Sequence, residues 1–485
     1  MKIQLRPYQQ QAINELRAAF NASHKSVILC APTGAGKTIM FSSIVAQTVA
    51  NNKKVLIVTD RKELLTQSDG ALSLFGINSE ALTPKTKKVP TNKVVVAMVE
   101  TLARRIKKEE YLTWFKSLDL IIFDEAHKQN FDKLFEYKSE RTYVIGATAT
   151  PYRDGNQTEL KKYYSKIINP IDIPYLIDSG FLANPISYGV SIDLSNVKTK
   201  AGEYDANQVA NLLEQNKVYN GVIKNYKRIC EGKKTLVFSG TIKSSKRILD
   251  SFLKSGYNAK HLDSEMPKEQ RDGIINWYKE TPGAILCNVG ILTTGFDAPS
   301  TEVVILYRAT KSMPLFLQMC GRGSRVTEGK DSFYILDFGN NIKRFGFWEK
   351  DGREWSLEKK KKNGGSAPVK NCPCCDALLY ASAKICNYCD HEFIPSKKEA
   401  EQVELIELTK EYQDEPKWKI LKDAERANLD QLVKMTKAKL IKPFWALHKC
   451  FKSYNEALQY TRALGYKDGF LYHQTKTGNF KNLIQ

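Results

Sequence analysis

Residues 27–38 read VILCAPTGAGKT, a short apolar run that leads directly into a glycine-rich, basic turn. The turn fits the pattern G-x-x-x-x-G-K-[ST], except that Ala31 takes the place of the first glycine. The two later glycines let backbone N–H groups approach phosphate oxygens, and a helix N-terminus after the turn adds positive potential. In this pattern Lys37 reaches the β- and γ-phosphates and Thr38 offers a hydroxyl to Mg²⁺. The stretch therefore predicts a nucleoside-triphosphate site; a chance glycine-rich turn is the alternative.

A second apolar run, residues 120–123, ends in the adjacent carboxylates Asp124 and Glu125. At the carboxyl end of a strand Asp124 can hold Mg²⁺ through water, and Glu125 can orient or deprotonate an attacking water. An acidic pair at a strand end is commonly structural. Coupled to the glycine-rich turn about 90 residues earlier, it indicates hydrolysis of the nucleotide.

Short β-branched runs recur along the chain with helical stretches between them. Such runs are typical of strands buried on both faces, and their alternation with helices indicates parallel sheets. One set comprises residues 27–29, 55–59, 94–97, 120–123 and 143–145, and another comprises 236–238, 284–286, 303–306 and 334–336. The two sets predict two α/β domains, with a joint near residues 152–191 that Gly180 and Pro185 punctuate.

The composition narrows the class of protein. The 485 residues carry a formal net charge of +21, which favours a polyanionic partner, nucleic acid before membrane, because neutralised phosphates release counterions. A basic protein without such a partner is the alternative. Hydrophobic residues at 42% and charged residues at 26% are ordinary globular values. No run approaches the roughly 18 apolar residues of a membrane helix, and the N-terminus lacks a signal-peptide layout, so we expect a cytoplasmic protein without membrane association.

Four of the ten cysteines form two C-x-x-C pairs separated by ten residues, namely Cys372 with Cys375 and Cys386 with Cys389. Each pair aims two thiolates at one point, and two pairs complete a tetrahedral Zn²⁺ shell. A closed shell of four thiolates leaves no open position, so the predicted site is structural. A ligand set shifted to Cys374 or His391, redox pairs and free thiols are the alternatives.

The sequence changes character after residue 338. A charged, glycine-containing linker at residues 359–366 leads to the cysteine module at about 370–393. From residue 396 onward the chain is charged and helix-prone, with aromatic residues among lysines towards its end. This tail either stacks bases or binds duplex backbone, or it is a helical domain with an aromatic core.

Residues 124–127, DEAH, resemble the Walker B motif of superfamily 2 helicases, and the other motifs of that family follow in the expected order. They are Gln9 in 5–9, the motif III stretch 146–151, motif IV at 235–240, motif V at 293–299 and motif VI at 318–325. The resemblance covers roughly residues 1–340 and implies two tandem RecA-like domains. With the four-cysteine module and basic tail, and with residues 193–204, the chain resembles the RadD-type bacterial and phage DNA-repair helicases. Branch-migrating phage helicases and restriction motor subunits share the core.

The resemblance also implies roles for individual residues. The implied catalytic set is Lys37, Asp124, Glu125, Gln318, Arg322 and Arg325, and Mg²⁺ is assigned to Thr38 and Asp124. The implied ATP contacts are Gln9, Thr33, Gly34, Ala35, Gly36, Lys37, Thr38, Asp124 and Asp297. Nucleic acid is assigned to Arg61, Thr101, Ser239 and Thr294. We expect Arg322 and Arg325, one turn apart on a helix, to reach the γ-phosphate as arginine fingers.

The sequence thus predicts an α/β protein with two tandem RecA-like parallel-sheet domains, a small zinc knuckle and a helical C-terminal domain. The expected boundaries are 1–155, a joint at 156–190, 191–345, a linker at 346–369, the zinc module at 370–394 and a helical region at 395–485.

We expect an ATP-dependent helicase or translocase, using ATP, Mg²⁺ and Zn²⁺, that acts on single-stranded or branched DNA in repair or recombination. Single-strand-binding or recombination proteins are the expected partners. A restriction motor subunit and an ATP-gated DNA-binding or annealing protein are the alternatives. Asp132, Glu136 and Lys138 superficially fit a nuclease pattern, which we interpret as coincidence.

Overall fold

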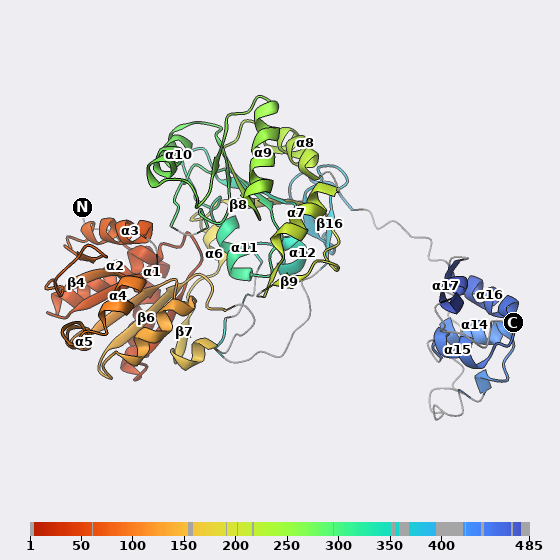
Figure 1. The fold of residues 1–485 in the computed structure, drawn as a ribbon, viewed down its shortest axis with the longest axis horizontal. Helices are drawn as coiled ribbons and strands as arrows, with labels where there is room; N and C mark the ends of the chain where they lie inside the picture. Colours follow the sequence, from red (N-terminus) through yellow and green to blue (C-terminus); the bar gives the residue numbers. More distant parts are fainter. Residues whose placement is uncertain are drawn as a thin grey trace. The chain divides into compact units, whose positions relative to one another are not determined.

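The computed structural model describes residues 4–60, 62–153, 159–190, 192–200, 202–215, 218–293, 295–350, 353, 355–357, 368–393, 421, 423–437, 441–466 and 469–476. The chain divides into two compact units, Met1–Phe393 and Ile394–Gln485. The larger unit contains two α/β lobes, coloured red to orange and yellow to cyan in Figure 1. Each lobe is built on one parallel sheet, and the two units are described separately below.

The first lobe is built on a seven-stranded sheet in the order β3-β4-β2-β5-β6-β1-β7, in which every pairing is parallel. Its strands are β1 Ser26–Cys30, β2 Val55–Thr59, β3 Glu80–Leu82, β4 Val94–Met98, β5 Leu120–Asp124, β6 Tyr143–Thr148 and β7 Lys166–Ile168. Its helices are α1 Pro7–Asn21, α2 Lys37–Ala50, α3 Lys62–Ser73, α4 Val99–Arg105 and α5 Glu109–Lys116, with 3₁₀ turns η1 Gln129–Glu136 and η2 Glu159–Lys162. All five strands predicted for this lobe are confirmed, because β-branched runs buried on both faces form its centre.

The second lobe is built on a six-stranded parallel sheet in the order β12-β13-β11-β14-β15-β8. Its strands are β8 Asn184–Gly189, β11 Thr235–Ser239, β12 Ala259–Leu262, β13 Ile285–Asn288, β14 Val303–Tyr307 and β15 Ser332–Asp337, and a hairpin joins β9 Thr199–Lys200 to β10 Glu203–Tyr204. Its helices are α7 Ala206–Gln215, α8 Val218–Cys230, α9 Ile242–Lys254, α10 Lys268–Glu280, α11 Met313–Cys320 and α12 Asn341–Phe345. The four strands predicted for this lobe are confirmed, and two parallel-sheet domains in tandem form the predicted fold.

The segment between the lobes belongs to both sheets. Strand β7 pairs with β1 at one edge of the first sheet, and β8 pairs with β15 at one edge of the second. The short helix α6, Ile173–Asp178, lies between them in the chain, with the Asp172 side chain accepting a hydrogen bond from the Tyr175 N–H. The predicted joint therefore contributes an edge strand to each lobe rather than a simple connection.

A second crossing between the lobes follows α12. Trp348 is buried in the second lobe, where its ring packs edge-on against Phe333 and its Nε1 donates to the Leu317 carbonyl oxygen at 3.2 Å. Leu357 is buried in a cluster that otherwise consists of first-lobe residues, and Trp355 packs against the same cluster. The chain is therefore anchored in both lobes within ten residues, and we call residues 348–357 the return segment.

The cysteine module packs against the second lobe. Its strands β16 Val369–Asn371 and β17 Leu378–Tyr380 are antiparallel. Gly189 at the end of β8 faces Leu378 so closely that a Cβ there would lie 2.6 Å from Leu378 Cδ1. The Tyr388 hydroxyl donates to the Pro185 carbonyl oxygen at 3.2 Å, and the rings of Phe347 and Tyr380 lie 4.8 Å apart. The module thus covers the edge strand β8.

The smaller unit is helical in its described part, with α14 Leu429–Lys437, α15 Pro443–Lys449, α16 Tyr454–Ala463 and α17 Gly469–Lys476. Tyr460 is completely buried in its core, where the hydroxyl lies 2.5 Å from Thr436 Oγ1, and Phe451 packs against the Tyr460 ring. Tyr472 is 55% exposed. These contacts match the predicted helical domain with an aromatic core. No helix in the described part of the chain has the length and apolar character needed to span a bilayer.

Candidate active site

The glycine-rich turn, residues 31–38, joins the buried strand β1 to helix α2, as the motif requires. Gly34 has φ 100° and Gly36 has φ 77°, a left-handed region that side chains with a Cβ rarely adopt. Gly36 is the N-cap of α2, so the free N–H groups of the first helical turn face the concave side of the turn. The local geometry is that of an anion-binding loop, which we call the phosphate loop.

Lys37 points back across the phosphate loop. Its Nζ donates to the carbonyl oxygens of Ala31 at 2.9 Å and Pro32 at 3.3 Å. Burial lowers the pKa of Lys37, and the carboxylates of Glu125 and Asp124 act in the opposite direction. The ammonium group therefore lies between the loop and the two acids, where it can bind a phosphate.

Asp124 is the last residue of β5 and is buried, and Glu125 follows with φ 59°. The Glu125 N–H donates to Asp124 Oδ1 at 3.1 Å. Burial raises the pKa of Asp124 to about 7, the adjacent Glu125 adds to the rise, and Lys37 opposes it. The two neighbouring carboxylates and the Thr38 hydroxyl, in the first turn of α2, are the kinds of oxygen donor that Mg²⁺ prefers, and a divalent cation would stabilise both acids in the charged form. The residues present therefore fit Mg²⁺ bound together with a triphosphate.

His127 connects the two acids to the end of strand β6. Its Nδ1 lies 2.9 Å from Thr148 Oγ1 and 3.4 Å from Glu125 Oε2. Thr148 Oγ1 in turn accepts a hydrogen bond from the Thr150 N–H at 3.1 Å. A rotation of Glu125 is thereby linked to the backbone of motif III, residues 146–151.

The two arginines of motif VI do not lie on a helix, so that expectation was wrong. Helix α11 ends at Cys320 with Gly321 as its C-cap, and Gly321 packs so closely against the phosphate loop that a Cβ at 321 would lie 2.9 Å from Thr33 Cβ. A Cβ at Gly323 would meet the Phe333 ring even more closely. The chain therefore leaves the helix and runs to an isolated bridge between Arg325 and Leu182.

The structure separates the two arginines by what they contact. Arg322 donates to the carbonyl oxygen of Thr293 at 2.6 Å and to that of Phe296, which fastens motif V. Arg325 reaches the other lobe: a Cβ at Gly34 would lie 2.5 Å from its Nη1. Its Nε lies 3.4 Å from Asp297 Oδ1. Arg325 is therefore the arginine that faces the phosphate loop, and Asp297 orients it.

Gln9 lies beside the phosphate loop with both ends of its amide engaged. Its Oε1 accepts from the Arg6 N–H at 3.0 Å, and its Nε2 donates to the Ala35 carbonyl oxygen at 3.2 Å. The Tyr8 hydroxyl donates to the same oxygen at 2.9 Å. In this structure Gln9 supports the loop.

Gln318 lies on the second lobe at a cavity of about 380 Å³ between the lobes. The cavity is lined by His127 and Arg153 of the first lobe and by Ser312 and Leu315 of the second. Gln318 is buried, and its Nε2 has no hydrogen-bond partner among the described residues. Motif VI thus faces the loop that follows the two acids.

Of the four residues assigned to nucleic acid, the two that the structure describes do not lie on an exposed surface. Thr101 in α4 and Ser239 at the end of β11 are both buried. Arg61 and Thr294 lie outside the described residues. The sequence analysis does not predict the ion pairs of Lys128 with Asp60 and of Arg153 with Asp132, which surround the loop after Glu125. The one available signal was a cation two residues after the proline that ends motif III.

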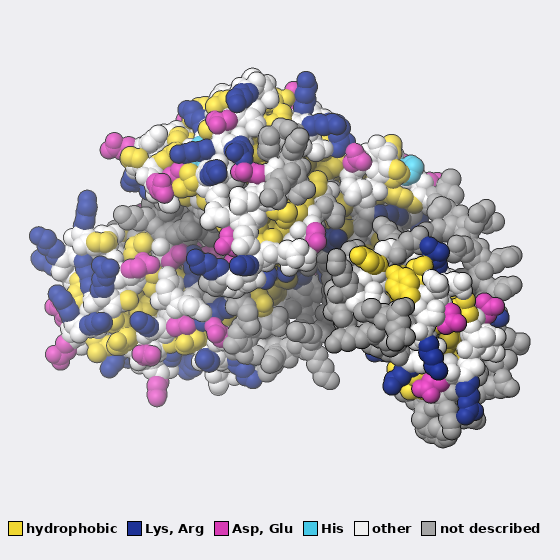
Figure 2. All heavy atoms as spheres, turned by 45° about the vertical axis from the view of Figure 1, so that its right-hand side comes forward, with side chains coloured by type: hydrophobic (Ala, Val, Ile, Leu, Met, Phe, Trp, Pro, Cys, Tyr) yellow, Lys and Arg dark blue, Asp and Glu magenta, His cyan; other side chains and the backbone are white. Residues whose placement is uncertain are grey.

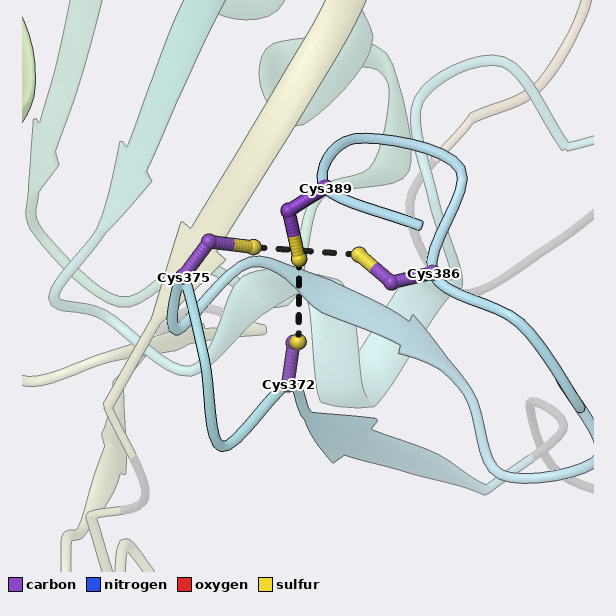
Figure 3. Close-up of side chains that lie close together, drawn as sticks. All are labelled: Cys372, Cys375, Cys386 and Cys389. Carbon is purple, nitrogen blue, oxygen red and sulfur yellow. Dashed lines mark hydrogen bonds between the residues drawn. The ribbon is translucent and has the colours of Figure 1, made fainter. Parts of the chain in front are cut away.

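The four cysteines of the predicted zinc site converge (Figure 3). Their sulfur atoms all lie within 4.8 Å of one another, with Cys372 Sγ 3.6 Å from Cys389 Sγ and Cys375 Sγ 3.7 Å from Cys386 Sγ. Four thiolates about 2.3 Å from a central zinc ion lie about 3.8 Å apart in a tetrahedron. The cluster therefore fits Zn²⁺, whereas the exposed Cys374 lies outside it.

Two protein-family models match the chain in succession: "Type III restriction enzyme, res subunit" over residues 2–153 and "Helicase conserved C-terminal domain" over residues 219–327. A "51.5 kDa protein" of a Lactococcus phage is 30% identical over 398 residues, which cover 78% of this chain and 82% of the relative. The "Putative ATP-dependent helicase IRC3" of Saccharomyces cerevisiae is 31% identical over 358 residues, which cover 69% of this chain and 51% of the relative.

Among solved structures, the fragment of a putative HsdR subunit of a type I restriction enzyme from Vibrio vulnificus has the same fold. Its TM-score is 0.55 at 24% identity, with 68% of this chain and 63% of that chain covered. The chain spans only about half the length of the yeast relative. It belongs to the superfamily 2 helicases, whose paired RecA-like domains hydrolyse ATP.

Proposed function

We propose that this ATP-hydrolysing helicase is a DNA translocase that moves along or remodels single-stranded or branched DNA. The observation that carries the proposal is the position of Arg325, which extends from the second lobe to Gly34 in the phosphate loop of the first. ATP held between the lobes would be contacted by both, so its hydrolysis would release one lobe from the other. Repeated closing and opening of this kind moves a motor along a strand.

The charge of the chain supports a polyanionic substrate. The net charge is +21, and Figure 2 shows Lys and Arg side chains spread over both lobes on the face drawn. Such a distribution supports contacts to phosphates, which position nucleic acid without reading its sequence. DNA is proposed over RNA from the likeness to RadD-type helicases.

A place in DNA repair or recombination is supported by the four-cysteine module that follows the core, which is the feature shared with the RadD-type group. Single-strand-binding or recombination proteins would then be its partners. The paired thiols suit a reducing compartment, which supports a cytoplasmic location.

The second candidate function is the motor subunit of a restriction or defence assembly. Both the first family model and the Vibrio structure carry restriction names, which favours this candidate. The carboxylate Asp132 would not serve a nuclease, because it accepts two hydrogen bonds from Arg153 at 2.6 and 2.8 Å. In this role the cleavage activity would come from another chain.

Addition of DNA is expected to raise the kcat for ATP hydrolysis about 10-fold, within the usual range for coupling between two sites. The measurement is steady-state hydrolysis with single-stranded, duplex, forked and branched DNA, and with RNA of matched length as the control. Strand separation on the same substrates distinguishes a helicase from a translocase that does not unwind. Equal hydrolysis with and without every nucleic acid would contradict the translocase proposal.

The purified protein is expected to contain one zinc ion per chain, lost on Cys375→Ser because three thiolates leave the tetrahedral shell open. The matched control is Cys374→Ser, one position away but exposed and outside the cluster, which should retain the metal. Elemental analysis measures the metal content, and thermal unfolding measures the loss of support for β8. Wild-type protein without stoichiometric zinc would refute the site.

A further inference from the structure

Arg153, two residues beyond motif III, holds the loop that follows Asp124 and Glu125. Its Nε donates to the His127 carbonyl oxygen at 2.8 Å, and its Nη2 donates to the Lys128 carbonyl oxygen at 3.3 Å. Its two terminal nitrogens also grip the Asp132 carboxylate at 2.8 and 2.6 Å. Arg153 is only 7% exposed, and a buried fork with four such contacts fixes the loop in one position.

Two consecutive residues of this loop point to different sites. His127 reaches Glu125 and Thr148 on the nucleotide side. Lys128 has extended backbone, φ −74° and ψ 140°, so its side chain leaves in a different direction from that of His127. Its Nζ forms an ion pair with Asp60, directly after the end of β2. Strands β2 and β5 are neighbours in the sheet, which brings the two strand ends together.

Asp60 immediately precedes Arg61, the residue assigned to nucleic acid in motif Ia. Its Oδ2 accepts from Lys128, while its Oδ1 is buried without a hydrogen-bond partner among the described residues. A buried carboxylate with one unpaired oxygen responds strongly to any change in its surroundings, because the unsatisfied atom is costly. A phosphate bound at the end of β2 would repel the Asp60 carboxylate and attract the Lys128 ammonium group, and so would act directly on the ion pair between them.

We propose that Lys128, in the loop that Arg153 holds, is a positioning residue that couples nucleic acid bound at the end of β2 to Glu125 through its ion pair with Asp60. Arg153 holds the loop rigid, and Lys128 joins it to Asp60, so that a displacement at Asp60 moves His127 against Glu125. The inference rests on the proposed function, because it assumes that nucleic acid stimulates hydrolysis. It assigns that stimulation to one ion pair.

The test is a double-mutant cycle on Lys128→Met and Asp60→Asn, measured as kcat and KM for ATP with and without single-stranded DNA. Each single variant is expected to keep its DNA-free kcat and its KM within about two-fold of wild type while losing at least about five-fold of the stimulation. The double variant should lose no more than either single variant, because both remove the same contact. Lys128→Arg preserves the charge and should restore most of the stimulation.

The matched control is the ion pair between Lys53 and Asp119, with 3.3 Å between Lys53 Nζ and Asp119 Oδ1. It lies where the same two strands, β2 and β5, begin, at the opposite ends of these strands from Lys128 and Asp60. Lys53→Met and Asp119→Asn should leave the stimulation unchanged. Thermal unfolding of all variants separates loss of coupling from loss of folding.

The outcomes for the two proposals are distinct. If wild-type protein shows no stimulation by any nucleic acid, the proposed function fails. If wild-type protein is stimulated and the Lys128 and Asp60 variants are stimulated equally, only the coupling role is overturned. If the two single variants lose stimulation but their effects add in the double variant, the ion pair is not the coupling contact and the inference is also overturned.

Discussion

Lys37→Ala is expected to reduce ATP hydrolysis at least about 100-fold, the loss typical for a preorganised group that stabilises developing charge. Lys37 Nζ lies across the phosphate loop, 2.9 Å from the Ala31 carbonyl oxygen, and the carboxylates of Glu125 and Asp124 both act to raise its pKa. The substitution removes the positive charge at this position and leaves the glycine geometry of the loop intact. The measurement is kcat for ATP with saturating DNA.

DNA binding by the Lys37→Ala protein should survive, because Lys37 faces the nucleotide rather than the outer surface of the lobes. Fluorescence anisotropy with labelled single-stranded DNA measures this directly. Lys53→Ala removes an exposed lysine of the same lobe and serves as the control for loss of charge alone. Hydrolysis by Lys37→Ala within ten-fold of wild type would overturn the assignment of the phosphate loop.

Arg325→Ala is expected to lower kcat about 1,000-fold, the lower end of the range for an arginine finger. The contact that motivates this expectation is the approach of Arg325 Nη1 to Gly34, on the opposite lobe. Binding of a non-hydrolysable ATP analogue should change little, because the phosphate loop and Lys37 belong entirely to the first lobe. Arg325→Lys should not restore the rate, since an ammonium group lacks the planar fork of guanidinium.

Arg322→Ala serves as the comparison for Arg325→Ala. Arg322 donates to the backbone at Thr293 and Phe296, so its loss should lower the unfolding temperature of the protein as well as its activity. Arg325→Ala should leave the unfolding temperature close to that of wild type, because its ion-pair partner Asp297 is largely exposed. A normal kcat in Arg325→Ala would contradict the role of Arg325 as an arginine finger and, with it, the proposal that both lobes contribute to hydrolysis.

The central strands of each sheet could be predicted from the sequence because they are short, continuous apolar runs, a pattern that loops and surface helices do not share. The edges could not: β7, Lys166–Ile168, has one fully buried residue, and β8, Asn184–Gly189, begins beside a proline. Both carry the mixed burial of an edge, which a single sequence does not distinguish from a loop. Both strands lie inside the predicted joint at 156–190, and the predicted domain boundaries remain proposals.

The same distinction between local patterns and distant contacts applies to the candidate site. Lys37, the two acids and the four cysteines could be predicted because each belongs to a local pattern with fixed spacing. The pairing of Lys128 with Asp60 joins residues 68 positions apart, and that of Arg153 with Asp132 spans 21. Single charged residues carry no local signal of such partners. The helical placement of Arg322 and Arg325 is wrong because α11 ends at Cys320, and the close packing of Gly321 and Gly323 against distant residues leaves no signal in the local sequence.

The return segment sets a limit on how far this motor can open. Leu357 lies nine residues after Trp348, and a fully extended chain of that length spans about 30 Å. A separation of the two anchors beyond that length would pull Trp348 or Leu357 out of its buried position. The return segment therefore ties the two lobes together independently of anything bound between them.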